Sequence, residues 1–155
     1  MAKKFFLLFL FAALAISTPS GVNAQDSAAK LARASLENYF KAWAEPDDDV
    51  RRKILEAGWA EDGTYTDPSA HVEGREALVM HIGGFKKNAR ANGMNIVRTS
   101  DIQFHHNVFR FQWEMRGPDG KTLTPGMDYG EFNDKGMITK IVGFFGPFPA
   151  MEKTE

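Results

Sequence analysis

The stretch Phe109-Arg-Phe-Gln-Trp-Glu-Met115 says more about the fold than any other part of the 155-residue chain. Its large apolar side chains alternate with polar or charged ones, and this period of two places one set on each face of a β-strand. The turn sequences Gly117-Pro-Asp-Gly120 and Asn133-Asp-Lys-Gly136 separate this run from further strand-like runs. From Met94 onward we therefore expect a meander of about four long strands with one apolar face.

The chain before the meander has the pattern of helices. Residues 26–44 carry apolar side chains at roughly helical spacing, and Glu45-Pro46 ends that segment because proline lacks a backbone donor. Three acids, Asp47-Asp-Asp49, then precede a second helix expected over residues 50–57. Negative charge at that position suits the helix dipole, so capping explains these acids.

A short strand within Trp59–Pro68 separates the second helix from a third, expected over about residues 74–92 with an interruption at Gly83-Gly84. Helices followed mainly by strands indicate an α+β domain in which the helices cover one face of a sheet. The apolar side of each strand would then face the helices.

The composition is that of one ordinary soluble domain, with 43% hydrophobic residues, 25% charged residues and a formal net charge of −1. The chain has no cysteine, which excludes thiol nucleophiles, disulfides, iron–sulfur clusters and cysteine-based zinc sites. The balanced charge predicts no nucleic-acid partner, since such surfaces need a clustered basic excess. The four histidines show no metal-ligand spacing, so we expect no metal site.

Residues 1–24 have the parts of a secretory signal peptide: Lys3-Lys4, an apolar run over residues 5–16, and Val22 and Ala24 before the cleavage point. A helix over the apolar run would span only about 18 Å of a hydrocarbon core about 30 Å thick. We therefore expect no stable membrane anchor, although a buried N-terminal helix is an alternative. Cleavage near Ala24 would give a secreted or periplasmic protein with a single domain over residues 25–155.

Three segments resemble the nuclear transport factor 2-like superfamily, which includes SnoaL-like polyketide cyclases and ketosteroid isomerases. They are Trp59-Ala-Glu-Asp-Gly-Thr-Tyr-Thr-Asp-Pro68, Glu73-Gly-Arg-Glu-Ala-Leu78 and Gly126-Met-Asp-Tyr-Gly-Glu-Phe-Asn-Asp-Lys-Gly-Met-Ile138. The resemblance implies a cone-shaped domain, a cystatin-like α+β roll, with about three N-terminal helices packed on a curved, mostly antiparallel sheet. It also implies an apolar pocket and a homodimer.

The resemblance to the isomerases implies three catalytic residues. Tyr39 takes the place of an oxyanion donor, Asp67 before Pro68 that of a general base, and Asp128 that of a neutral acid. An apolar site can keep such an acid protonated, as in ketosteroid isomerase. One carboxylate would then move a proton at carbon, while the phenol and the neutral acid donate to the enolate oxygen.

Each of these residues also has a structural explanation. Asp67 suits a turn, and Tyr39 suits the apolar face of a helix. Asp128 is harder to explain structurally, because aspartate is depleted in strands and this one lies between Met127 and Tyr129.

The aromatic and methionine content predicts a roomy, adaptable interior. The side chains expected to contact a substrate are Trp43, Trp59, Tyr65, Met80, Phe104, His106, Phe111 and Trp113. His106 is included because it shares strand parity with Phe104, whereas His105 would face the other way. The segment Gly143–Pro149 is too rich in proline for a regular strand, and it is a candidate cover for the pocket or for a partner subunit.

Two classes of function stay open, because this superfold hosts both enzymes and binding proteins. One is a cofactor-independent isomerase, cyclase or dehydratase that transfers a proton next to a carbonyl group. The other is a noncatalytic small-molecule-binding or dimeric interaction domain. Either would take a small apolar or carbonyl-containing molecule, and we expect no cofactor for either. A buried cluster of Tyr39, Asp67 and Asp128 would favour the enzyme, and scattered positions would favour the binding domain.

Overall fold

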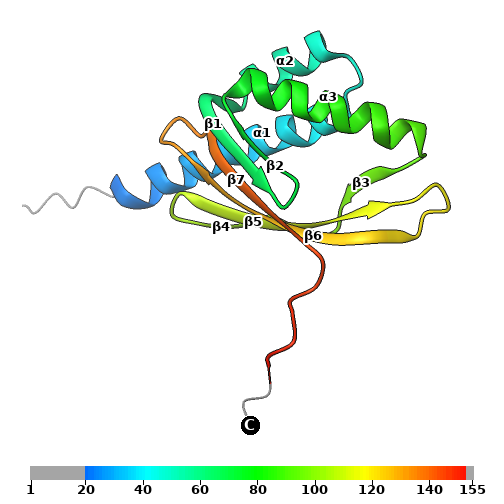
Figure 1. Cartoon of the computed structure of the whole chain (residues 1–155). Coiled ribbons are helices and arrows are strands. Elements are labelled where there is room, and N and C mark those ends of the chain that lie inside the picture. The colour runs from blue at the N-terminus through cyan, green and yellow to red at the C-terminus, as the bar shows by residue number, and fades with distance from the viewer. Residues whose placement is uncertain (1–19, 153–155) are drawn as a thin grey trace, which may run out of the picture.

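The computed structural model describes residues 20–152, which form helices packed against one curved sheet (Figure 1). The elements in chain order are α1 (Ser20–Ala44), α2 (Asp48–Glu56), β1 (Trp59–Asp67), β2 (Ala70–Glu73), α3 (Arg75–Ala91), β3 (Asn95–Arg98), β4 (Gln103–His105), β5 (Val108–Arg116), β6 (Thr122–Phe132) and β7 (Ile138–Phe145). The strand order is β2-β1-β7-β6-β5-β3, and β4 also pairs with β5. The β1–β7 pair is parallel and the other pairs are antiparallel.

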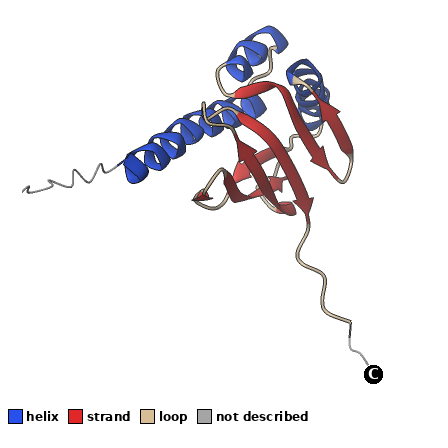
Figure 2. Ribbon diagram, turned by 90° about the vertical axis from the view of Figure 1, so that its left-hand side faces the viewer, coloured by secondary structure: helices blue, strands red, loops and turns tan. Residues whose placement is uncertain are grey.

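The three helices lie on one side of the sheet, and the strands curve beneath them (Figure 2). This arrangement confirms the expected α+β class, with helices on a curved, mostly antiparallel sheet. The order of elements differs in one respect, because a hairpin of β1 and β2 precedes α3. Asp67 makes the turn of that hairpin by accepting hydrogen bonds from the backbone N–H and the hydroxyl of Ser69.

Helix α1 packs on the sheet through one continuous apolar face. Ala32, Leu36 and Tyr39 are spaced by three or four residues and are all buried, as helical periodicity requires. They share one core with Trp59 of β1 and Ile141 of β7. Burial of a side chain such as that of Leu36 contributes about 1.5–3 kcal/mol to stability.

Helix α3 runs through Gly83 and Gly84 without a break, so the predicted interruption there is wrong. A Cβ at Gly83 would lie 2.6 Å from the Asp48 Oδ1 atom and 2.9 Å from the Arg51 Nη1 atom. The absent side chain at Gly83 therefore lets α2 approach α3 closely, and packing between the helices outweighs the low helix propensity of glycine.

Arg51 of α2 joins the three helices from inside the core, where it is 0% exposed. Its guanidinium group pairs with the Asp48 carboxylate and donates to the carbonyl oxygens of Ala42, Glu45 and Val79. Two of these oxygens belong to the end of α1 and the residue after it, where carbonyls lack helical partners and favour a cation. Arg51 thus fixes how α1 ends against α2 and α3.

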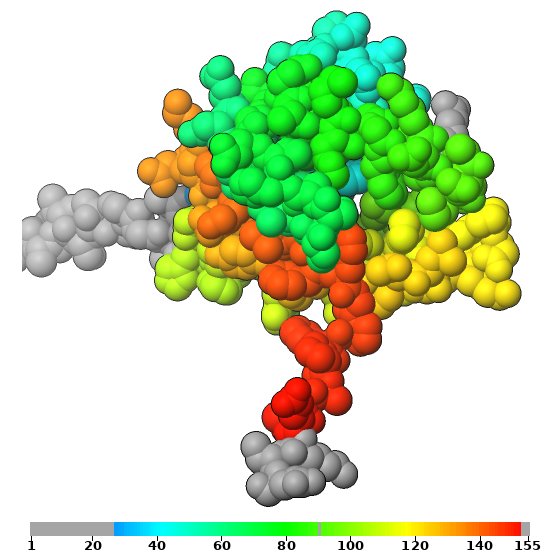
Figure 3. Space-filling view, in the orientation of Figure 1, coloured from blue at the N-terminus to red at the C-terminus, as the bar shows by residue number. Residues whose placement is uncertain are grey.

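The segment after β7 leaves the domain and stands clear of it (Figure 3). Phe148 is 88% exposed and Met151 is 94% exposed, so this segment does not cover the pocket of its own chain. Most of the predicted signal peptide, residues 1–19, lies outside the described residues. Within residues 20–152, no helix combines the length and the hydrophobicity needed to span a membrane.

Candidate active site

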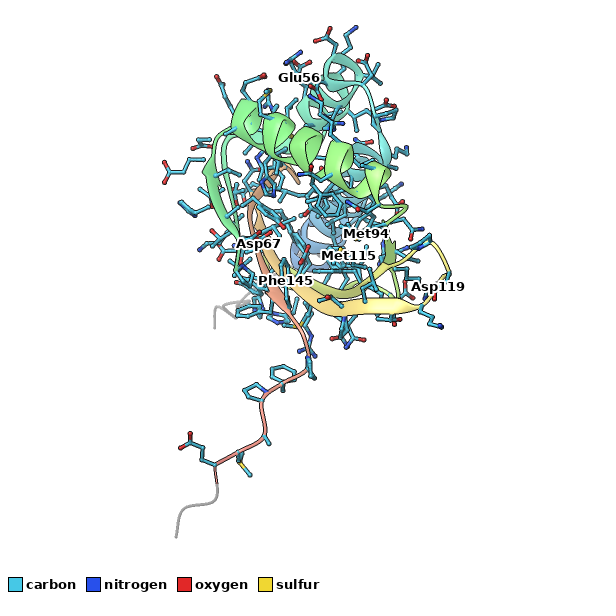
Figure 4. The ribbon with its side chains drawn as sticks, turned by 45° about the vertical axis from the view of Figure 1, so that its right-hand side comes forward. Glu56, Asp67, Met94, Met115, Asp119 and Phe145 are labelled. Atoms are coloured by element: carbon cyan, nitrogen blue, oxygen red, sulfur yellow. The ribbon has the colours of Figure 1, made fainter. Side chains whose placement is uncertain are left out.

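A cavity of about 210 Å³ lies between the helices and the sheet. Its wall consists of Tyr39, Phe40 and Trp43 from α1, Phe85 from α3, Tyr65, Asp67 and Ser69 from β1 and its turn, Ile96 and Arg98 from β3, Phe111, Trp113 and Met115 from β5, Thr124 and Asp128 from β6, and Phe145 from β7. Figure 4 labels Asp67, Met115 and Phe145 around this space. Most of the wall is aromatic or aliphatic, as in sites for small organic molecules.

The three residues proposed as catalytic all line this cavity. Asp128 pairs with Gly143 across β6 and β7, and a Cβ at Gly143 would lie 3.0 Å from the Asp128 Oδ1 atom and 3.5 Å from the Asp67 Cβ atom. The two acids therefore flank the bare backbone of Gly143, with Cα atoms roughly 10 Å apart from the spacing of strands. Tyr39 reaches the same space from α1.

Asp128 is a buried acid, only 5% exposed. Burial raises the pKa of its carboxyl group to about 7, and the nearby charge of Asp67 also raises it. Hydrogen bonding from the Trp113 indole N–H, at 2.8 Å, and from Tyr39 opposes this rise only in part. Asp128 consequently keeps its proton to a much higher pH than an exposed aspartate does.

Trp113 is held in place by the strand beside it. A Cβ at Gly126, its partner on β6, would lie 2.2 Å from the Trp113 ring, so the indole occupies the space above this glycine. The edge of the Trp113 ring packs against Phe145, with centroids 5.4 Å apart. These contacts fix the direction in which the indole N–H points at Asp128.

Asp67 has the opposite electrostatic environment. Its partial burial tends to raise the pKa of its carboxyl group, but hydrogen bonds lower that pKa below the ordinary value overall. The donors are the hydroxyl of Ser69, the Tyr65 phenol at 2.8 Å, and the backbone N–H groups of Ser69 and Ala70. Asp67 is therefore ionised where Asp128 still holds its proton.

Both tyrosines of the site are neutral donors. Burial raises the pKa of Tyr39 and of Tyr65 well above the ordinary value, and the neighbouring charge of Asp128 raises both further. The Tyr39 ring stacks on Trp59 with centroids 5.9 Å apart, which holds its hydroxyl in the cavity wall. The Tyr65 hydroxyl is committed to Asp67.

Four of the predicted substrate contacts line the cavity: Trp43, Tyr65, Phe111 and Trp113. The other four, Trp59, Met80, Phe104 and His106, lie outside its wall. Trp59 is 0% exposed beneath Tyr39, and its indole fills the space above Gly63. It supports the site without reaching a ligand.

Met80, Phe104 and His106 are corrected for different reasons. Met80 lies on the outer face of α3 and is 57% exposed. Phe104 contacts Phe109 and Phe132 in another part of the core. His106 lies after the end of β4 with a φ of 52°, and its side chain is exposed, so the alternation of a strand does not extend to it.

The sequence analysis missed several wall residues, namely Phe40, Ser69, Phe85, Ile96, Arg98, Met115, Thr124 and Phe145. Met115 belongs to the alternating face of β5, and Ser69 follows the Asp67-Pro68 turn signal, so both had a local signal. Ile96 and Arg98 had no local signal in the sequence, because their position in the cavity wall depends on the pairing of β3 with β5.

A curved sheet under three helices, with an acid pair inside an apolar cavity, defines a class of protein. The chain has the SnoaL-like fold of the nuclear transport factor 2-like superfamily, as its sequence motifs predicted. No family model matches the chain, and no curated protein matches its sequence. The similarity comes from solved structures.

One similar structure is a SnoaL-like family protein from Agrobacterium tumefaciens whose proposed activity is that of an isomerase. It is 28% identical, the match covers 81% of this chain and all of the other, and the TM-score is 0.65. A proposed polyketide cyclase from Sinorhizobium meliloti is 17% identical over 70% of this chain and 92% of its own, with a TM-score of 0.55.

A de novo designed protein with a curved β-sheet also matches, at 16% identity over 76% of this chain and 87% of its own, with a TM-score of 0.57. The fold is therefore compatible with a sequence made without a natural function. Any activity has to be argued from the site itself.

Proposed function

We propose that this chain is a cofactor-independent enzyme that transfers a proton at a carbon next to a carbonyl group, as isomerases, cyclases and dehydratases do. The observation that carries the proposal is the pair of carboxyl groups on either side of Gly143 in a single apolar cavity, whose environments shift their pKa values in opposite directions. Titratable groups whose environments push their pKa values apart are typical of acid–base sites. The likeness to the Agrobacterium tumefaciens protein adds support.

In this proposal the substrate lies above Gly143 with its carbonyl oxygen towards Asp128 and Tyr39. The ionised Asp67 removes a proton from the neighbouring carbon, and the electron pair of the C–H bond moves into the developing enolate. Protonated Asp128 and neutral Tyr39 donate hydrogen bonds to the enolate oxygen. Asp67 then returns the proton to the same or another carbon, which completes an isomerisation without any other reactant.

The typical contributions of hydrogen-bond donors and of a general base to catalysis are large enough for the roles given to Asp128, Tyr39 and Asp67. One hydrogen-bond donor aimed at a developing oxyanion contributes about 3 kcal/mol, and a positioned base contributes about 10²–10⁴-fold in rate. The apolar wall formed by Phe111 and Trp113 strengthens both effects, because charges interact more strongly where water is scarce.

Exchange of carbon-bound protons with solvent is the direct test. In D₂O, NMR should detect enzyme-dependent loss of the α-protons of enolisable cyclic ketones, and Asp67→Asn should slow that loss about 10²-fold or more. Asp62→Asn, at an exposed acid on the same strand, is the matched control and should exchange like the wild type.

Ketones that bind without any exchange above the solvent background would contradict the enzyme proposal. They would support the second candidate, a noncatalytic small-molecule-binding domain, which the largely apolar wall also suits.

We also propose export with cleavage near Ala24. The signal-like features of residues 1–24 support it. Among the described side chains of α1, which begin at residue 27, those that pack into the core start at Ala28. Cleavage would leave these contacts intact. N-terminal sequencing of exported protein should begin at or near Gln25, and a cytoplasmic protein retaining Met1 would contradict the proposal.

A further inference from the structure

The polar groups of the cavity lie at two separate ends. Asp67, Ser69, Tyr65 and Asp128 form one end, and Arg98 and Thr124 belong to the other. Arg98 on β3 pairs with Trp113, which pairs in turn with Gly126. This row lies two residues along the strands from the row of Phe111, Asp128 and Gly143, so the two rows share one face of the sheet. Strand spacing places the Cα atoms of Arg98 and Asp128 roughly 12 Å apart, with aromatic rings between them.

The Arg98 guanidinium group forms part of the cavity wall. Its central carbon lies 5.0 Å from the centroid of the Phe40 ring, and the Phe40 ring in turn meets Phe111 edge to face at 4.9 Å. Stacking on an aromatic face holds a guanidinium group with its N–H donors directed sideways, where they can bind an anion.

Among the described side chains, residues 27–89 and 91–152, Arg98 has no carboxylate partner, whereas Arg51 and Arg116 each have one and Arg52 has two. Of the side chains that the structure describes, it is also the one cationic group in this cavity wall. The net charge of the wall therefore changes sign from the Asp67 end to the Arg98 end.

We propose that Arg98 makes this site selective for carbonyl compounds that carry a carboxylate group at the end remote from the carbonyl. The inference rests on the proposed function for the carbonyl end, and it adds the substrate class. Arg98 binds the carboxylate with two N–H donors, which match its two oxygens. The negative charge of Asp67 repels the same group, so the ligand binds in one direction, with its carbonyl at Asp128 and Tyr39.

A matched pair of probes tests this: 3-(4-oxocyclohexyl)propanoate and the corresponding uncharged amide. Calorimetry at low salt should give at least about tenfold tighter binding of the carboxylate, and the preference should shrink with added salt. Arg98→Gln should abolish the preference without weakening the amide, and Arg98→Lys should keep part of it. Arg110→Gln, on the other face of the neighbouring strand β5, is the matched control and should bind like the wild type.

Equal binding of the two probes by the wild type, binding of neither, or a preference that survives Arg98→Gln would overturn the inference. The α-proton exchange of both probes, measured in the same samples, separates this failure from failure of the proposed function. If the α-protons exchange but the carboxylate probe binds no more tightly than the amide, only the proposed role of Arg98 is contradicted. If the carboxylate probe binds more tightly in an Arg98-dependent way but no α-proton exchanges, the proposed proton transfer is contradicted and the proposed selectivity for carboxylates stands.

Discussion

Two aspartates of the same cavity have pKa values shifted in opposite directions, because Asp128 is deeply buried and Asp67 is partly exposed with several hydrogen-bond donors. Asp67 lies at a turn where the Ser69 hydroxyl, the Tyr65 phenol and backbone N–H groups stabilise its negative charge. Asp128 lies in the middle of β6, where the Trp113 indole is its one short hydrogen bond among the described residues. The same side chain can therefore serve as a base at one position and as an acid at the other.

Burial of the Asp128 carboxyl group makes the stability of the protein depend on pH, and this dependence can be measured. Asp128 has a higher pKa in the folded state than in the unfolded chain, so the stability it contributes is fully present below about pH 4. That contribution is lost as the pH rises towards 7, because the folded state must then ionise a buried group or keep a proton that the unfolded chain releases.

We predict that the wild type loses about 2–3 kcal/mol of unfolding free energy between pH 5 and pH 8 relative to Asp128→Asn. Urea denaturation of both proteins at the two pH values measures this difference. Parallel pH dependence in the two proteins would contradict a raised pKa for Asp128.

At the residue scale, the sequence placed a side chain in the cavity where a local pattern identified it. Asp128 stands out because aspartate is depleted in strands and this one lies between Met127 and Tyr129. Asp67 is a candidate through the resemblance to the isomerases, and its turn-forming role is the structural alternative. His106 and Met80 could not be placed this way, because one lies just past a strand end and the other on the outer side of a helix. Arg98 was missed because a charged residue in a four-residue strand has no pattern to read.

The elements meet at Arg51, which links α1, α2 and α3 by donating to the carbonyl oxygens of Ala42, Glu45 and Val79. The helices had recognisable sequence signals: helical periodicity in α1, a proline after it, and Asp47 as the N-cap of α2. The packing of the helices against one another had no such signal in the sequence, because the contact of Gly83 with α2 depends on tertiary structure. Glycine in α3 was therefore read as a break.

Arg51→Met should lower the unfolding free energy by about 3–5 kcal/mol, because the variant leaves the Asp48 carboxylate and several carbonyl oxygens without their cation. Urea denaturation checks this value. Arg52→Met is the matched control, since Arg52 lies at the surface with Glu76 and its loss should cost far less. Equal losses in the two variants would contradict the role of Arg51 as the link between the helices.

At the scale of the whole molecule, large apolar side chains remain exposed on β6, at the end of β7 and on the segment that follows β7. They include Leu123, Phe144, Phe145, Phe148 and Met151. Such a concentration of apolar surface is typical of an interaction site, and a second copy of the chain would satisfy it. We propose a homodimer that covers this surface, in keeping with the expectation from the sequence.

Light scattering of the domain should therefore give about twice the mass of one chain. Phe148→Ser combined with Met151→Ser should shift the mass towards that of one chain, whereas Met80→Ser, at an exposed position on α3, should not. A monomer at high concentration would contradict the dimer and leave the fold unaffected.

The central claim is that Asp128 keeps its proton up to about pH 7, beside an Asp67 that is already ionised. Carbon-13 NMR titration of the Asp128 carboxyl group tests it most directly, without any knowledge of the substrate. We predict a midpoint near pH 7, which falls in Asp67→Asn because the neighbouring negative charge has been removed. A midpoint near pH 4 in the wild type, as in an exposed aspartate, would contradict the account.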